Sequence, residues 1–347
     1  MWYYFNKTKF YDTEFNKISN LLKSYLKSIN IPLYSVANSE KTEYEKNLKK
    51  VQDYFKKSKK CSENIRKFNG YLRRTSLQEI EKIKEIVNNN LEINNYLKNY
   101  ELFIPYKKLK DYGLSAEFIN NLRKMDINLW EYLSFKNNGK IKKQYYEMLY
   151  NSLNKKIYCP FCGINKLKNP KTSVKLSPLE HFIPKAKYPF VAWNTDNIFL
   201  ACEDCNSKKG EKRLKEKKSI FFPIELYMTP KIKLKLISYN LIEEEEILKN
   251  INEDNCIIKF ILENISKENF DKYLSDWNNF FSIENRLKEN LTFYVKKKER
   301  EFKMKKRLNP NFDFLTDIEV ELEEAEKDGN IIKVAYLEYK KNEIENN

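Results

Sequence analysis

The chain of 347 residues has a single histidine and only 6 glycines. It also has no run of about 18 apolar residues, so the sequence predicts no membrane-spanning helix. The opening segment, MWYYFNKTKF, lacks the hydrophobic stretch and the small-residue cleavage site of a secretory signal. We therefore expect a cytoplasmic protein without a membrane partner.

Cysteine is scarce as well, at 6 residues in the chain. A reducing compartment argues against a disulfide framework, and four of the six cysteines stand in two C-x-x-C pairs, a pattern typical of metal binding. The remaining two, Cys61 and Cys256, are predicted to be small buried core residues.

Charge is unevenly distributed along the chain, whose formal net charge is +16 and whose pI is near 9.2. A lysine-rich composition alone could produce that excess. Residues 155–218, however, hold fifteen Lys and Arg against six Asp and Glu, a net charge of +9, whereas residues 308–347 carry a net charge of −7. This segregation favours contact between the first segment and a polyanion such as nucleic acid.

Hydrophobic residues at 41% and charged residues at 33% are typical of a folded soluble protein. Residues 1–157 are predicted to form a basic helical region, with amphipathic helices at 13–29 and 76–97 and a further helix near 140–156. Ser76 is a candidate N-cap, because Glu79 follows three residues later.

Residues 158–218 are punctuated by proline and glycine, which predicts short strands and loops. In residues 219–347 we expect strands at 231–239 and 256–262, a long basic helix or helix pair over 269–308, and two short helices around Asp328-Gly329. The sequence therefore divides into three regions: 1–157, 158–218 and 219–347.

The two C-x-x-C pairs, Cys159-Cys162 and Cys202-Cys205, are separated by 39 residues. Two thiolates three positions apart can hold one tetrahedral ion, and two such pairs complete its four positions. A closed shell of four cysteines indicates a structural rather than a catalytic zinc. A redox dithiol is the alternative interpretation.

The single histidine, His181, lies inside the loop that the cysteine pairs enclose. A nuclease needs a base for water, a divalent cation and cationic groups for phosphates. His181 can accept a proton near neutral pH, and Glu180 and Asn206 offer the hard oxygen ligands that Mg²⁺ or Mn²⁺ prefers.

The segments LEHFIPK, DNIFL and CEDCNSKKG resemble the ββα-metal HNH endonucleases over roughly residues 155–215. Similar proteins include the HNH domain of the RNA-guided CRISPR nuclease and, more closely, zinc-stapled HNH proteins of bacterial anti-phage systems such as the Septu nuclease subunit. The resemblance implies that His181 is the general base and that Asn206 is a metal ligand. It also implies that Asn197 orients the histidine or its loop, and that Glu180 stands where the family usually has a metal-binding Asp.

The fold implied by this resemblance is α+β and predominantly helical, with a ββα-metal core embedded in helical flanks. One short strand would end at His181, a second would span about residues 198–201, and a helix would begin near Cys202. The acids Asp196, Glu203 and Asp204 are expected at the surface. The cationic residues expected to contact nucleic acid are Lys185, Lys187, Lys208, Lys209, Lys212 and Arg213.

The sequence thus predicts a Mg²⁺- or Mn²⁺-dependent endonuclease that hydrolyses DNA, most simply double-stranded DNA, in anti-phage defence. Two alternatives stay open. The chain could be a zinc-ribbon module that binds nucleic acid without cutting it. It could also be a subunit that docks an ATPase or a sensor protein, with the acidic tail as a docking surface, and this role is compatible with nuclease activity.

Overall fold

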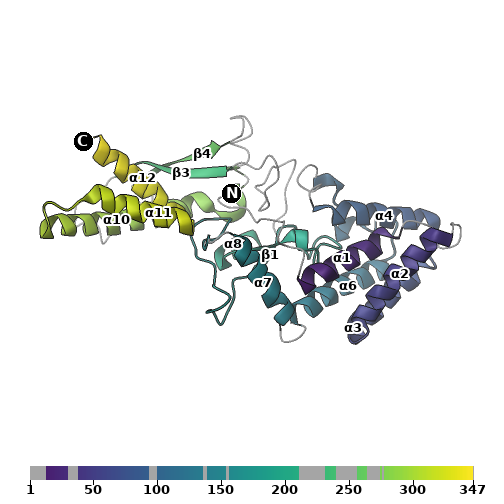
Figure 1. Cartoon of the computed structure of the whole chain (residues 1–347). Helices are drawn as coiled ribbons and strands as arrows, with labels where there is room; N and C mark the ends of the chain where they lie inside the picture. The colour runs from purple at the N-terminus through teal and green to yellow at the C-terminus, as the bar shows by residue number, and fades with distance from the viewer. Residues whose placement is uncertain are drawn as a thin grey trace.

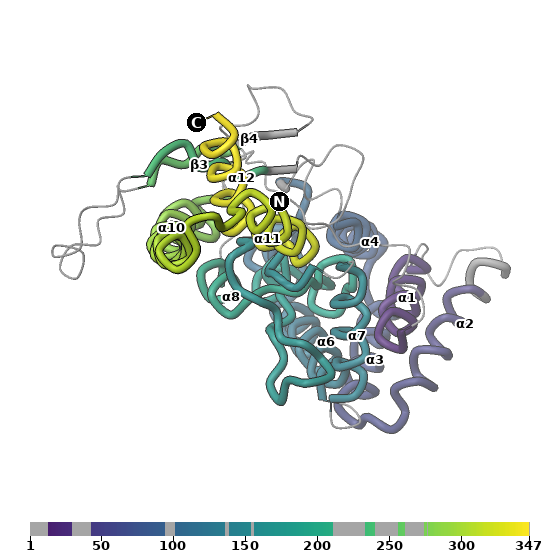
Figure 2. Tube along the Cα trace, turned by 60° about the vertical axis from the view of Figure 1, so that its left-hand side comes forward, coloured from purple at the N-terminus to yellow at the C-terminus, as the bar shows by residue number. Residues whose placement is uncertain are grey.

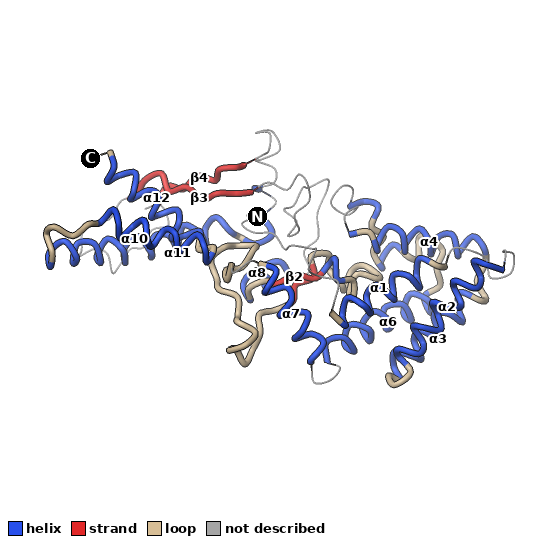
Figure 3. The backbone as a smooth tube through the Cα atoms, in the orientation of Figure 1, coloured by secondary structure: helices blue, strands red, loops and turns tan. Residues whose placement is uncertain are grey.

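The computed structural model describes residues 13–29, 38–93, 100–135, 139–153, 156–210, 231–239, 256–263 and 274–346 except 276. Within these residues the fold is α+β and predominantly helical, with two separate two-stranded antiparallel sheets (Figures 1 and 3). This confirms the predicted fold class. None of the described helices is both long enough and apolar enough to cross a bilayer.

The N-terminal part is a set of packed helices, and its local signals are those that the sequence predicted. Thr13 caps the first helix by accepting a hydrogen bond from the Asn16 amide. Ser76 and Glu79 form the expected capping box at the start of α4. The helices are α1 (Glu14–Lys27), α2 (Asn38–Phe55), α3 (Lys59–Leu72), α4 (Leu77–Leu91), α6 (Ala116–Phe135) and α7 (Lys140–Ser152), with 3₁₀ turns at Tyr100–Leu102 and Tyr106–Lys108.

A small β-hairpin followed by a helix lies between the N-terminal and C-terminal helices (Figure 1). Strand β1 (Leu179–His181) pairs antiparallel with β2 (Ile198–Leu200), so that His181 stands opposite Ile198. The 3₁₀ turn η4 (Thr195–Asn197) leads into β2, and α8 (Glu203–Lys209) follows it. The predicted order of strand, strand and helix is confirmed.

The C-terminal part combines the second hairpin with three helices. Strands β3 (Lys231–Tyr239) and β4 (Cys256–Glu263) pair with a register shift between Leu236 and Ser238. They lie beside α12 (Ile331–Glu345), which forms a bundle with α10 (Ile283–Leu308) and α11 (Phe314–Asp328) (Figure 2). Gly329 ends α11 at φ 76°, as the predicted Asp328-Gly329 break requires. Of the predicted helical segment 269–308, residues 269–273 and 276 lie outside the described residues.

One continuous hydrophobic cluster joins these parts. It runs from Phe15 in α1 through the hairpin residues Ile198 and Phe199 to Tyr336 in α12. Both three-residue strands are buried along their whole length, which places the central hairpin inside the molecule rather than on its surface. Cys61 and Cys256 are buried, as predicted. The three-region division stays a prediction.

Candidate metal centre and active site

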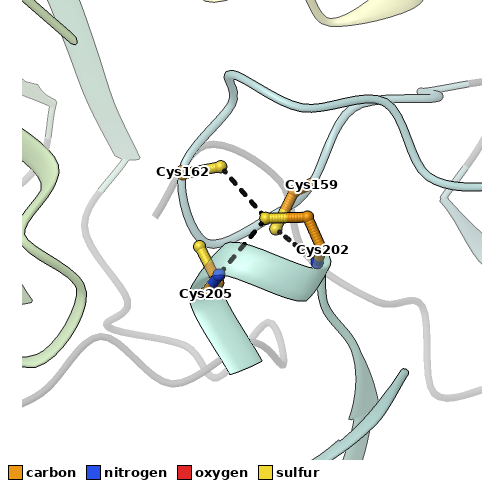
Figure 4. Close-up of side chains that lie close together, drawn as sticks. All are labelled: Cys159, Cys162, Cys202 and Cys205. Atoms are coloured by element: carbon orange, nitrogen blue, oxygen red, sulfur yellow. Dashed lines mark hydrogen bonds between the residues drawn. The ribbon is translucent and has the colours of Figure 1, made fainter. Parts of the chain in front are cut away.

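Four buried cysteines meet at the start of α8. The sulfur atoms of Cys159, Cys162, Cys202 and Cys205 all lie within 4.8 Å of one another, and the Cys162 and Cys202 sulfurs are 3.8 Å apart. Figure 4 shows two of them on the loop after α7 and two on the first turn of α8. The sulfur edges of a tetrahedral zinc site are roughly 3.8 Å long for bonds of about 2.3 Å. The donor set and its spacing therefore fit a structural zinc.

Backbone amides point toward these sulfurs. The Ile164 amide donates to Cys162 Sγ at 3.4 Å, and the Cys202 amide donates to Cys159 Sγ at 3.3 Å. The Cys205 amide donates to Cys202 Sγ at 3.4 Å. Such donors stabilise sulfur that carries negative charge, as thiolate ligands of a metal do. The arrangement favours metal binding over a redox dithiol.

Arg286 from α10 adds a cation at the same place. Its Nη1 lies 3.5 Å from Cys205 Sγ and its Nη2 lies 3.3 Å from the Asp204 carboxylate. Burial opposes the charged guanidinium, yet the neighbouring sulfurs of Cys162 and Cys205 raise the pKa of Arg286 overall. The C-terminal helices are thus electrostatically joined to the cysteine cluster.

His181 ends β1 and is buried against the aromatic ring of Trp130. The two rings meet edge to face, with centroids 4.4 Å apart. His181 Nε2 lies 2.8 Å from the Ala192 carbonyl oxygen. Because a carbonyl can only accept, Nε2 carries the proton and Nδ1 holds the free lone pair. Burial and the cations Lys185, Lys209 and Lys142 keep the pKa of His181 well below its usual range, so the ring is neutral at pH 7.

Glu180 and Lys209 form a buried ion pair beside that histidine. Lys209 Nζ lies 2.5 Å from Glu180 Oε1 and donates to the His181 carbonyl oxygen at 2.7 Å. Burial raises the pKa of Glu180, and the attraction to Lys209 acts against that rise. In this structure Lys209 therefore contacts Glu180 and the backbone of His181, whereas the sequence placed it among the cations expected to contact nucleic acid.

Asn197 fixes the loop that follows His181. Its Oδ1 accepts from the Ile183 amide at 2.6 Å, and its Nδ2 donates to the carbonyls of Ile183 and Val191 at 2.9 and 3.1 Å. Its own carbonyl accepts from the Phe182 amide at 2.9 Å. The side chain is fully buried and all its polar atoms are used, which makes Asn197 a positioning residue.

Asn206 is half-buried on α8, three residues before Lys209. Residues three apart share a helix face, so Asn206 lies on the side of α8 that Lys209 turns toward β1. It borders an open cavity of about 550 Å³ that also contacts Ser177 and Pro178, immediately before β1. Lys142 and Lys175 border the same cavity and supply positive charge.

Buried polar side chains on the helices hold the loop between β1 and β2, and sequence reasoning did not find them. Asp126 on α6 accepts from the Phe190 amide at 2.9 Å and from the Trp193 indole at 2.8 Å. Phe190 has φ 67°, a left-handed conformation that costs energy for a side chain of this size. Other partners of the loop are Asn90, which donates to the Pro189 carbonyl, and Tyr145, which donates to the Thr195 carbonyl.

The predicted phosphate contacts fall into three groups. Lys185 and Lys208 are exposed, and Lys187 is half-buried. Lys209 is buried in the ion pair described above. Lys212 and Arg213 lie outside the described residues.

The three acids expected at the surface each have a partner. Asp196 pairs with Lys23 of α1 at 2.7 Å, and Glu203 pairs with Lys175 at 2.8 Å. Asp204 pairs with Arg286 and also accepts from Asn165 at 2.7 Å. Among the described residues, the four cysteines are the one gathering of three or more His, Cys, Asp or Glu ligands.

Comparison with known proteins gives one related sequence. The chain is 32% identical over 94 residues to the "Septu protein PtuB" of Bacillus thuringiensis. The match spans 27% of this chain and 33% of that protein, about a third of the relative's length. No protein-family model matches the chain, and no solved structure matches it significantly.

Proposed function

We propose that this protein is a metal-dependent nuclease of the HNH type, with His181 as the general base and a structural zinc on the four cysteines. The observation that carries the proposal is the environment of His181. A neutral imidazole stands at the end of a short buried strand, Nε2 is tied to a carbonyl, and Nδ1 holds the lone pair. A general base needs this state at neutral pH.

Two of the predicted site residues suit a hydrolytic site. The Glu180 carboxylate and the Asn206 amide oxygen are hard donors that would hold Mg²⁺ or Mn²⁺, together with water and substrate phosphate. The bound ion would neutralise charge on the scissile phosphate and on the departing oxygen. Lys209 favours the ionised form of Glu180, because its ammonium group acts against the burial that raises the pKa of this carboxyl.

The zinc has a mechanical role in this proposal. Cys202 and Cys205 lie on the first turn of α8 and bind the loop that carries Cys159 and Cys162. A rigid start to α8 fixes the positions of Asn206 and Lys209 relative to β1. The four cysteines thereby hold together two elements that are far apart in the sequence.

Nucleic acid fits the charge of this region. Lys142 and Lys185 lie close enough to His181 to lower its pKa, and residues 155–218 carry the net charge of +9 noted above. Double-stranded DNA is the substrate we propose, bound through its phosphates. Similarity to a protein named for the Septu system supports a role in anti-phage defence, with an ATPase or sensor protein as partner.

Cleavage of plasmid DNA by the wild-type protein and by His181→Ala, in Mg²⁺ and in Mn²⁺, tests the proposal. Wild type should cleave, and the variant should lose roughly 10²- to 10⁴-fold in rate, the usual contribution of a general base. Phe293→Ala, at an exposed position on α10 outside the site, is the control for an alanine substitution that has no role in cleavage.

DNA binding should be measured for both proteins in the same buffers, because it separates a nuclease from a zinc-bearing binding module. Equal cleavage by both proteins contradicts the role of His181. Absence of cleavage by either, while both bind DNA, favours the binding module.

A further inference from the structure

A second cavity lies near His181. Its volume is about 490 Å³, and it is bordered by Trp130, Tyr106, Ile127, Phe135, Arg123 and Lys185. Ala192, whose carbonyl accepts from His181, also borders it. Trp130 contacts the imidazole itself. Trp130 and Ala192 therefore border the cavity and also contact His181 of the proposed active site.

The lining is unusually apolar for a surface exposed to water. Ile127 and Phe135 on α6 are 55% and 72% exposed, and the half-buried Trp130 lies between them on the same helix. Ile127 stands three residues before Trp130 and eight before Phe135, spacings that place the three side chains on one side of α6. Contiguous exposed apolar side chains of this kind mark binding sites in soluble proteins.

Cations lie over the aromatic rings in this cavity. Lys185 Nζ is 4.5 Å from the centre of the Trp130 ring, and the Arg123 guanidinium carbon is 4.8 Å from the centre of the Tyr106 ring. Glu131 and the buried Asp126 are the acids on its border. Flat aromatic surfaces accompanied by Lys and Arg are the chemistry that binds a base together with its phosphate.

We propose that this cavity takes one unpaired nucleobase next to the phosphate that lies at His181. The proposal rests on the proposed nuclease function and names its substrate more closely. The base stacks on Trp130 and contacts Phe135, while Lys185 leaves the ring and pairs with the adjoining phosphate. A base inside an intact duplex cannot reach this ring, so within double-stranded DNA the protein binds where a base is locally unpaired, and a single strand offers the same unpaired base in a binding assay.

Binding, rather than cleavage, tests the proposal, because Trp130 also contacts the general base. The full chain carrying His181→Ala is titrated with a labelled single-stranded oligothymidylate and with an abasic strand of the same number of phosphates. The base-bearing strand should bind about ten-fold more tightly, the low end of the range for a stacked base. Adding Trp130→Ala should abolish the preference, and Trp130→Phe should keep most of it.

Phe135→Ala provides a variant whose folding is safe, because its ring is 72% exposed. It should reduce the preference for the base-bearing strand by several-fold. Phe293→Ala on α10 is the matched control, with the same 72% exposure, and should leave the preference unchanged.

Equal affinity of the His181→Ala protein for the two strands would overturn the proposal. So would a base preference that survives both Trp130→Ala and Phe135→Ala. These outcomes are separate from the nuclease assay: plasmid cleavage without base preference removes the cavity's role and leaves the nuclease. A base preference that depends on Trp130, without cleavage in the plasmid assay, supports the cavity's role and contradicts the proposed nuclease function.

Discussion

At His181, burial and a single carbonyl contact determine the charge and the tautomer of the ring, which the sequence alone could not predict. Burial keeps the ring neutral, and the Ala192 carbonyl decides which nitrogen carries the proton. The sequence predicted the residue, because one histidine stood next to an acid inside a cysteine loop. It could not predict the tautomer, since Ala192 acts through its backbone, which any residue supplies.

Asn197 gives the first prediction at this scale. Replacing it by Ala removes three side-chain hydrogen bonds and leaves the Ile183 and Val191 groups buried without that partner. Each buried group left unpaired costs about 1–3 kcal/mol. We expect the free energy of unfolding to fall by roughly 2–4 kcal/mol and the proposed nuclease activity to fall with it. Urea denaturation measures the first, and exposed Asn169→Ala should change neither.

Lys209 gives the second prediction. Lys209→Met leaves the Glu180 carboxylate buried without its cation, which costs roughly 3–5 kcal/mol for a buried pair. Adding Glu180→Gln should recover part of that loss, because a neutral amide needs no counter-charge. Lys208→Met, the exposed neighbour, is the control. A stability of Lys209→Met equal to that of the Lys208 variant would show that the ion pair is dispensable.

The difference in burial between Lys208 and Lys209 could not be predicted from the sequence. Both lysines stand in the same basic segment, and charge counting treats them alike. Only the helical geometry of α8 decides that Lys209 turns inward to Glu180 while Lys208 faces solvent. For Asn206, by contrast, the position in the motif was enough to propose a role on that helix.

Among the elements, the loop between β1 and β2 depends on helices that precede it by many residues. The short strands and α8 were predicted, because prolines and glycines indicate a region of short elements and the resemblance to the HNH endonucleases implied two strands and a helix at these positions. The contacts that hold the loop come from α4, α6 and α7, and no pattern in the sequence near the loop predicts them. A lone Asp126 in an amphipathic helix gives no sign that it accepts two hydrogen bonds from a loop more than sixty residues away.

Asp126 gives a prediction of pH dependence. Burial raises the pKa of Asp126 to about 6, although hydrogen bonds from Tyr106, Phe190 and Trp193 act against the rise. The folded protein therefore keeps a proton that the unfolded chain, with an ordinary Asp pKa near 3.8, releases. The contribution of Asp126 to stability is largest below that lower value, falls as pH rises to about 6, and is constant above it.

Comparison of wild type with Asp126→Asn over this range measures the effect, because the variant lacks the titrating group and keeps the others. We expect the wild type to lose up to about 3 kcal/mol relative to the variant between pH 4 and pH 6, which corresponds to two pKa units. A difference that does not change with pH would show that Asp126 is ionised throughout.

On the scale of the whole molecule, the cysteine cluster joins the hairpin to the C-terminal helices. Arg286 of α10 contacts Cys205, and the Trp277 indole donates to the Phe161 carbonyl at 3.0 Å. Gly163, at φ 64°, has Ile331 of α12 so close that an added Cβ would lie 2.6 Å from its Cδ1. The sequence predicted the zinc from spacing, but these contacts join residues that are 81 or more positions apart in the sequence.

Loss of the zinc proposed at the four cysteines should therefore loosen the C-terminal helices as well as the proposed active site. Without the metal, four thiols replace a charged cluster, and Arg286 loses the negative charge that it faces. Cys159→Ser should abolish binding of one equivalent of zinc and lower the unfolding temperature. Hydrogen exchange should then rise in α10 and α12, as well as in α8.

Cys61→Ser, at a buried cysteine outside the cluster, should keep the zinc and the protection of all three helices. Unchanged exchange in α10 and α12 after zinc is lost would show that the C-terminal helices dock on the hairpin through apolar contacts alone, independently of the charge at the cysteines.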